Sequence, residues 1–149
     1  MILITGAGGF IGGFLAKQLI KDSNQKIRCV DKKPLEEWYQ VHENAENVVC
    51  DLQHYDHCHN NMKDIKEVYN LAADMGGMGF IENNKALCML SVLINTNLLK
   101  ASVESKSVKR FFFSSSACVY NQDKQNSSNV IALKEEDAYP AMPEDGYGW

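Results

Sequence analysis

Residues 2–12 read ILITGAGGFIG, a β-branched run that passes directly into a glycine-rich turn. Gly6, Gly9 and Gly12 follow an expected strand and precede an expected helix, a spacing typical of dinucleotide-binding turns. A pyrophosphate must approach the backbone closely at a helix N-terminus, where free N–H groups and the helix dipole favour negative charge. We therefore predict that this turn holds a dinucleotide. A glycine-rich turn without a ligand is the alternative.

Acidic residues follow two later apolar runs. Asp31 lies about 20 positions beyond the glycines, where an acidic residue typically accepts hydrogen bonds from the adenosine ribose hydroxyls. Its carboxylate would repel a 2′-phosphate and so favours NAD over NADP, a preference that Lys32 and Lys33 weaken. Asp51 is expected to accept the adenine amino group, to cap the helix that follows it, or to do both.

Apolar runs alternate with segments of helical spacing along the chain. The runs, which are rich in β-branched or aromatic residues, cover residues 2–5, 27–30, 48–50, 68–71 and 110–114. The spacing of Phe10, Phe14, Leu15 and Leu19 predicts a helix directly after the glycine-rich turn. This alternation predicts an α/β fold, a Rossmann-like doubly wound parallel sheet with helices on both faces.

A long helix is expected over residues 83–103, where apolar residues recur at intervals of three and four. Asn83 or Asn84 is positioned to cap it. The helix is apolar around much of its circumference. It therefore either packs only on its own sheet or also faces a partner subunit in a homodimer.

Length and composition limit the class of protein. With 149 residues, 45% of them hydrophobic, one compact domain is expected over residues 1–149. A net charge of -4 and the lack of any Lys/Arg run argue against nucleic acid or a membrane as partner. We expect no stretch long and apolar enough to span a bilayer. Five scattered cysteines and an N-terminus without a basic region indicate a cytoplasmic protein.

A metal site is not predicted. His54, His57, Cys58 and His59 lie close together in the sequence. Adjacent residues on a helix point in different directions, however, and no second Cys or His cluster completes a tetrahedral set. A solvated helix start is the favoured interpretation of this segment.

Several motifs resemble the extended short-chain dehydrogenase/reductase family of sugar-nucleotide enzymes. They are the glycine pattern, Asp31, Asp51-Leu52, the NLAA run at residues 70–73, and Ser115 and Ser116 followed by Tyr147. Three longer stretches are similar, more narrowly, to the GDP-mannose 3,5-epimerases. They are NLAADMGGMGF at residues 70–80, FFFSSSACVY at residues 111–120 and ALKEEDAYPAMPEDGYGW at residues 132–149.

The resemblance implies a reaction and a set of site residues. In the family, NAD transiently oxidises the sugar C4 hydroxyl, the C3 and C5 protons become acidic, and hydride then returns to C4. For this sequence it implies that Tyr147 removes the C4 hydroxyl proton, that Ser116 hydrogen-bonds the same oxygen, and that Cys118 is an acid/base at carbon. The implied substrate is a nucleotide sugar like GDP-mannose, contacted by Gly76, Ser116, Ala117 and Cys118. The cofactor-binding set becomes Gly6, Gly9, Phe10, Ile11, Gly12, Asp31, Asp51, Leu71, Ala72, Ala73 and Tyr147.

The resemblance also concerns the residues after Tyr147. In the family a lysine four residues later helps to lower the pKa of the tyrosine, but this sequence stops at Trp149. The sheet is therefore expected to be incomplete, without its later strands or a substrate domain. We expect the N-terminal portion of a longer epimerase-like enzyme, inactive by itself. A non-catalytic NAD-binding module or remnant, or another sugar-nucleotide epimerase or dehydratase, is the alternative.

Overall fold

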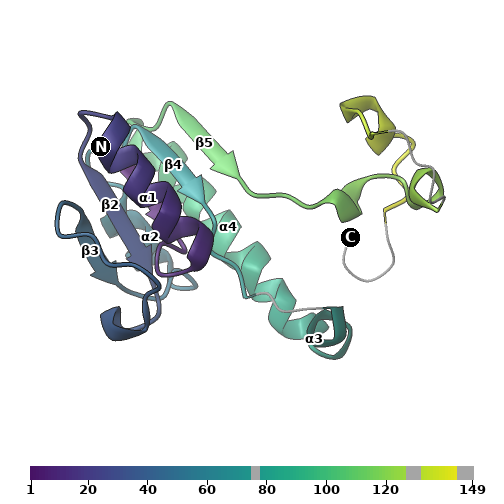
Figure 1. Cartoon of the computed structure of the whole chain (residues 1–149), viewed down its shortest axis with the longest axis horizontal. Coiled ribbons are helices and arrows are strands. Elements are labelled where there is room, and N and C mark those ends of the chain that lie inside the picture. The colour runs from purple at the N-terminus through teal and green to yellow at the C-terminus, as the bar shows by residue number, and fades with distance from the viewer. Residues whose placement is uncertain (75–77, 127–131, 144–149) are drawn as a thin grey trace. The chain divides into compact units, whose positions relative to one another are not determined.

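The computed structural model describes residues 1–74, 78–126 and 132–143. The chain packs as two compact units, whose elements can be followed along the chain in Figure 1. The sheet unit comprises Met1–Asp74 and Leu87–Ser114, and the loop unit comprises Met75–Ala86 and Ser115–Trp149. A single domain over residues 1–149 stays a prediction.

The sheet unit is built on five parallel strands in the order β3-β2-β1-β4-β5. The strands are β1 (Ile2–Thr5), β2 (Ile27–Asp31), β3 (Glu46–Val49), β4 (Glu67–Asn70) and β5 (Arg110–Phe113). In the central strand, Ile2 is in register with Ile27 on one side and with Glu67 on the other. Because all pairs are parallel, the carboxyl ends of the strands share one edge, where such sheets bind ligands. The predicted Rossmann-like parallel sheet is confirmed.

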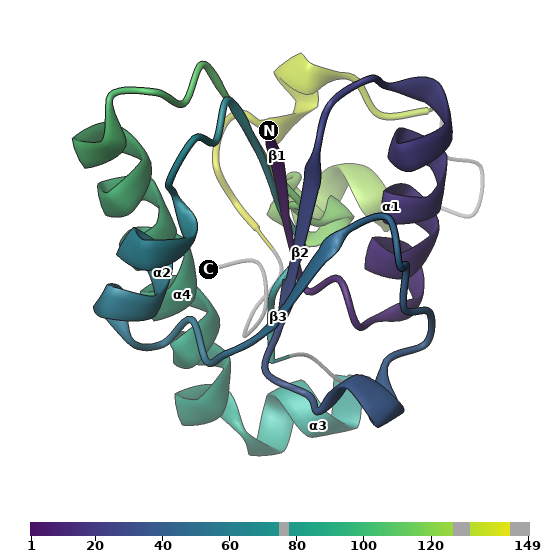
Figure 2. The same ribbon diagram turned by 90° about the vertical axis from the view of Figure 1, so that its left-hand side faces the viewer.

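Helices cover both faces of this sheet. Figure 2 shows α1 (Phe10–Asp22) on one face and α2 (Tyr55–Asn61) and α4 (Lys85–Ser105) on the other. Side chains of β1 alternate between the two layers: Leu3 packs in a core with residues of α2 and α4, and Ile4 packs with Ala16 of α1. The predicted helix after the glycine turn is confirmed, although Phe10 and Phe14 are 60% and 45% exposed.

Helix α4 corrects one expectation. It has 21 residues, and an 18-residue stretch within it has a mean hydropathy of 1.5. By length and composition alone it is therefore capable of crossing a membrane, although no such stretch was expected. Its packing resembles that of a crossover helix in a doubly wound sheet, because Ile94, Leu98 and Ala101 are buried in the core. The mostly buried core helices of soluble proteins pass the same length and composition test, whereas 22% of this stretch of α4 is buried.

The expected helix over residues 83–103 has different boundaries. Helix α3 (Met78–Asn83) precedes α4, and Asn84 lies between the two helices. The side-chain amides of Asn83 and Asn84 donate to the carbonyls of Gly79 and Phe80, at 2.6 and 2.9 Å. Both side-chain amides thus bond back to carbonyl groups of α3. Asn84 directly precedes α4, and capping of that helix by Asn83 or Asn84 stays a prediction.

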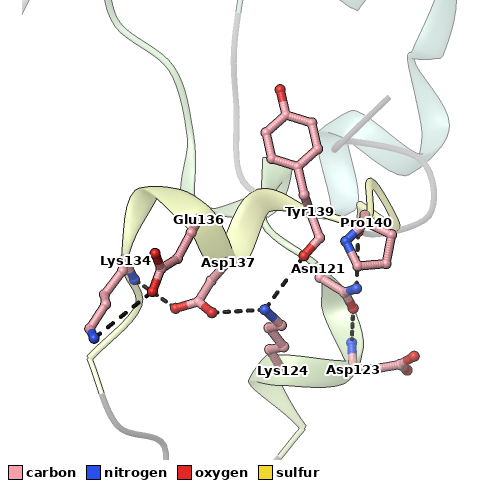
Figure 3. A network of polar contacts seen from close by, with 8 residues as sticks. All are labelled: Asn121, Asp123, Lys124, Lys134, Glu136, Asp137, Tyr139 and Pro140. Atoms are coloured by element: carbon pink, nitrogen blue, oxygen red, sulfur yellow. Dashed lines mark hydrogen bonds and ion pairs between the residues drawn. The ribbon is translucent and has the colours of Figure 1, made fainter.

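The loop unit holds α3 and three short 3-10 helices, η2 (Ala117–Val119), η3 (Gln122–Gln125) and η4 (Glu135–Ala138). Figure 3 shows the polar contacts that join η3 to η4. Lys124 Nζ lies 2.8 Å from one Asp137 oxygen, and the Lys134 backbone N–H donates to the other at 2.8 Å. The hydrogen bond from Lys124 holds the pKa of the Asp137 carboxyl below its ordinary value. The Asn121 side chain also donates to the Pro140 carbonyl at 3.0 Å, and Gln122 N donates to the Met142 carbonyl at 2.8 Å, so these contacts hold the described parts of residues 121–142 together.

Candidate functional site

The glycine turn brings bare backbone to the N-terminus of α1. Gly6 adopts φ +70°, a left-handed conformation that glycine accommodates without strain. A Cβ on Gly12 would lie 2.3 Å from the Gly6 carbonyl oxygen, so helix and turn pack with no room for a side chain. In the first turn of α1 the N–H groups of Phe10 and Ile11 have no partner within the helix. These features fit a pyrophosphate, with Phe10 and Ile11 contributing their backbone.

Asp31 ends β2 with its carboxylate fixed by backbone N–H groups. One oxygen accepts from Gly8 N at 3.0 Å and the other from Lys33 N at 3.1 Å. The Trp38 ring packs against Gly8, and its Nε1–H donates to the Lys33 carbonyl at 2.8 Å. Because a carboxylate offers about four lone-pair sites, Asp31 keeps acceptor capacity for ribose hydroxyls. Its position fits the predicted role, and Trp38 is a supporting residue that sequence reasoning missed.

Asp51 follows β3 at the same edge of the sheet. Cys50 N donates to the Asp31 carbonyl at 3.0 Å, which joins the two strand ends. The Asp51 carboxylate accepts from Gln53 N at 2.9 Å, and His54 occupies the N-cap of α2. The carboxylate therefore closes a local turn and does not cap α2, so the capping interpretation is wrong. A contact of Asp51 with adenine stays a prediction.

The segment after β4 passes directly beneath the glycine turn. A Cβ on Gly6 would lie 2.7 Å from the Leu71 carbonyl oxygen and 2.9 Å from Ala72 N. Leu71 N donates to the Thr5 carbonyl at 3.2 Å, which holds this approach in place. The structure thus brings together Gly6, Leu71 and Ala72 of the predicted cofactor set, and Ala73 follows in the same segment.

Asn70 is a second supporting residue that sequence reasoning missed. Asn70 is only 2% exposed. Its side-chain Oδ1 accepts hydrogen bonds from Thr5 Oγ1 at 2.8 Å and from Ala72 N at 3.3 Å. Its amide donates to Asn95 Oδ1 on α4 at 3.1 Å. One buried amide therefore joins the ends of β1 and β4 to α4 and to the segment that lies under the glycine turn. A polar residue within an apolar run was the available signal.

The loop unit contains two of the predicted catalytic residues, Ser116 and Cys118, in one short turn. Ser116 caps η2, and its Oγ accepts from Cys118 N at 3.2 Å. Ala117 lies between them, and Cys118 is half-buried. Ser116 thus makes the capping contact that was one interpretation of its sequence, and the roles of these residues toward a substrate stay predictions. Gly76 and Tyr147 lie outside the described residues.

The histidine segment makes local contacts. The rings of His54 and His57 meet edge to face with centroids 5.3 Å apart, and His57 Nδ1 lies 2.7 Å from the Asp51 carbonyl. Within residues 1–74, 78–126 and 132–143, no three His, Cys, Asp or Glu side chains gather as a metal site would require.

The cysteines are all free thiols in different environments. Burial raises the pKa of Cys29 to about 12, and burial likewise raises that of Cys58 to about 12, each from 9.0. At a pH between 9.0 and about 12, these thiols lose their protons in the unfolded chain and keep them in the folded chain. Their contribution to stability is therefore complete below about pH 9 and is lost as the pH rises toward 12.

This difference predicts selective alkylation. In a short iodoacetamide pulse at about pH 8.5, near the ordinary thiol pKa, we expect Cys88 and Cys118 to react and Cys29 and Cys58 to react about 100-fold more slowly. Mass spectrometry of the tryptic peptides measures each rate, and the same pulse in guanidinium gives the unprotected rates. Equal labelling of Cys29 and Cys118 in the native protein would contradict the burial described here.

Comparison with known proteins identifies the family. Residues 2–148 match the model of the NAD dependent epimerase/dehydratase family. Over 99% of its length the chain is 42% identical to GDP-mannose 3,5-epimerase 1 of Oryza sativa subsp. indica and 38% identical to GDP-mannose 3,5-epimerase of Arabidopsis thaliana. It spans 38% and 39% of the length of these two relatives.

A solved structure has the same fold. The UDP-glucose 4-epimerase of Thermus thermophilus, in complex with NAD, aligns with 99% of this chain and 46% of its own, with a TM-score of 0.79 and 20% identity. The predicted cofactor NAD is confirmed by the family, and the glycine turn and Asp31 provide a site that fits it. The chain belongs to the NAD dependent epimerase/dehydratase family.

Proposed function

We propose that the protein takes part in sugar-nucleotide epimerisation of the GDP-mannose 3,5-epimerase kind. The observation that supports this most strongly is the Ser116–Cys118 turn, in which one residue separates the serine that carries a hydroxyl from a half-buried cysteine. It occurs in a chain that is 42% identical, over nearly its whole length, to a rice enzyme of that name. A module that only binds NAD has no need of an acid/base at carbon.

The proposed roles divide between the two units. Bound NAD supplies reversible hydride transfer at the sugar C4 position. The glycine turn and Asp31 of the sheet unit bind and orient the dinucleotide. Tyr147 removes the proton of the C4 hydroxyl, and Ser116 hydrogen-bonds that oxygen. Once C4 is a carbonyl, the neighbouring C–H protons are acidic, and Cys118 Sγ removes or returns one of them.

The proposal extends to the setting of the reaction. Free cysteines suit a reducing compartment, so we place the protein in the cytoplasm. A homodimer through helix α4 would cover apolar side chains that the sheet leaves exposed. These are Leu87, Met89, Val92, Leu93, Leu99 and Val103.

Solvent exchange tests the proposal. Because the chain spans 38% of the rice relative, residues 1–149 are placed in that relative in exchange for its matching segment. With NAD in D2O, we expect NMR to show deuterium entering GDP-mannose at C3 or C5. Cys118→Ser should lower the rate of incorporation by about 100-fold or more, since acid–base groups contribute on this scale, with NAD affinity unchanged. Cys88→Ser, at another half-buried thiol, is the matched control.

Two other results would support an alternative function. A folded chimera that binds NAD without any incorporation would support a non-catalytic NAD-binding module. Incorporation that is insensitive to Cys118→Ser would remove Cys118 from the mechanism and favour another sugar-nucleotide epimerase or dehydratase.

A further inference from the structure

An ion pair joins the segments that follow β2 and β4. Lys32 Nζ lies 2.6 Å from Asp74 Oδ1. These two strands flank β1 in the sheet, so the pair lies across the carboxyl end of the central strand, beside the glycine turn. Asp74 is itself anchored, because its backbone N–H donates to Ser91 Oγ on α4 at 3.1 Å.

Stability alone gives little reason for this pair. The two side chains are 50% and 28% exposed, and ion pairs of such exposure contribute little to folding. Lys32 directly follows Asp31, whose two oxygens face the Gly8 and Lys33 N–H groups. The lysine beside the ribose-binding carboxylate therefore has its charge neutralised by a residue from another strand.

The position of Lys32 matters for cofactor choice. NADP differs from NAD by a phosphate on the ribose hydroxyl that a residue such as Asp31 binds, and a cation close to that residue is the group that accommodates the phosphate. A free Lys32 would attract it and oppose the repulsion by Asp31.

We propose that Asp74 determines cofactor specificity by binding Lys32 and neutralising its charge. Asp74 acts through Lys32 and is a positioning residue. The preference for NAD then depends on two carboxylates. Asp31 repels the 2′-phosphate, and Asp74 neutralises the lysine that would attract this phosphate. This role concerns the adenosine end of the cofactor and is independent of the sugar chemistry proposed above.

The test is Asp74→Asn in the whole chain, with the dissociation constants of NAD and NADP measured by titration calorimetry. The substitution keeps the shape of the side chain and removes its charge. We expect NADP to bind about 5- to 10-fold more tightly and NAD to change less than about 2-fold. The gain in NADP affinity should be smaller at about 1 M salt, because charges more than about 3 Å apart are then largely screened from each other.

Two controls make the outcome decisive. Lys32→Met added to Asp74→Asn should restore the original ratio of the two dissociation constants. Asp22→Asn, at the far end of α1, makes the same change of net charge and should leave the ratio unaltered.

Three results would overturn the proposal. They are an unchanged ratio in Asp74→Asn, whether neither dissociation constant shifts or both shift equally, a gain that survives Lys32→Met, and the same gain in Asp22→Asn. A wild-type chain that binds neither nucleotide would overturn it as well, together with the cofactor assignment. A failure of solvent exchange in the chimera would leave the binding ratios, and hence this proposal, unaffected.

Discussion

Gly12→Ala should abolish useful NAD binding, raising the dissociation constant by about 100-fold, or about 2.7 kcal/mol. The added methyl group would lie 2.3 Å from the Gly6 carbonyl oxygen and 2.7 Å from Ala7 Cα. Both neighbours are backbone atoms of the turn itself and have no side-chain freedom to yield. Helix α1 would have to move away from the turn, which displaces the N–H groups expected to receive the pyrophosphate. Titration calorimetry with NAD measures the loss.

Gly13→Ala is the matched control on the same helix. A Cβ there would lie 3.3 Å from Gln40 Cβ and 3.7 Å from the Ala7 carbonyl oxygen, so a shift of a few tenths of an ångström relieves the contact. Alanine is also favoured over glycine inside a helix by about 1 kcal/mol. We expect NAD affinity within about 3-fold of wild type and equal or greater stability. If the two variants lost affinity equally, the close approach at Gly12 would not be the cause.

Asn70→Ala should lower the free energy of unfolding by about 3 kcal/mol. The change removes the partners of Thr5, Ala72 and Asn95 in a site that is almost completely buried. Unpaired buried polar groups cost about 1–3 kcal/mol each, and bound water in the new cavity offsets part of this loss. Urea unfolding followed by tryptophan fluorescence and circular dichroism measures the change.

An exposed asparagine provides the comparison. Asn60 lies on the exposed side of α2, and Asn60→Ala should change stability by no more than about 0.5 kcal/mol. A loss below about 1 kcal/mol in Asn70→Ala would mean that the network around Asn70 contributes little. The variant should also bind NAD more weakly, because Asn70 holds the segment that packs under Gly6.

The cofactor half of the site was predictable because its determinants are local. A strand, a glycine turn and a helix start follow each other within residues 2–12, and Asp31 ends the next strand. Such features depend on backbone sterics and on alternation of apolar residues, which short stretches of sequence carry. Leu71 and Ala72 were assigned to the cofactor site by the resemblance to the family and not by these local features.

The contacts that join distant segments were not predictable. Lys32 and Asp74 are 42 positions apart, and Thr5 and Asn70 are 65 apart. The spacing of residues in the sequence does not predict such pairs, because only the order of the strands in the sheet brings the two partners together. Local ambiguity explains the error at Asp51, since an Asp side chain serves both in N-caps and in turns.

The place of β1 in the sheet affects how the protein must be made. Strand β1 is synthesised before the other four strands yet lies in the middle of the sheet, with β2 on one side and β4 on the other. On a ribosome that adds about 5–20 residues per second, β1 waits for several seconds with an unsatisfied edge until β4 emerges. During this interval the nascent chain exposes an apolar strand that a second nascent chain can pair with. We therefore expect the yield of folded protein to depend on the rate of translation and on chaperones that shield β1.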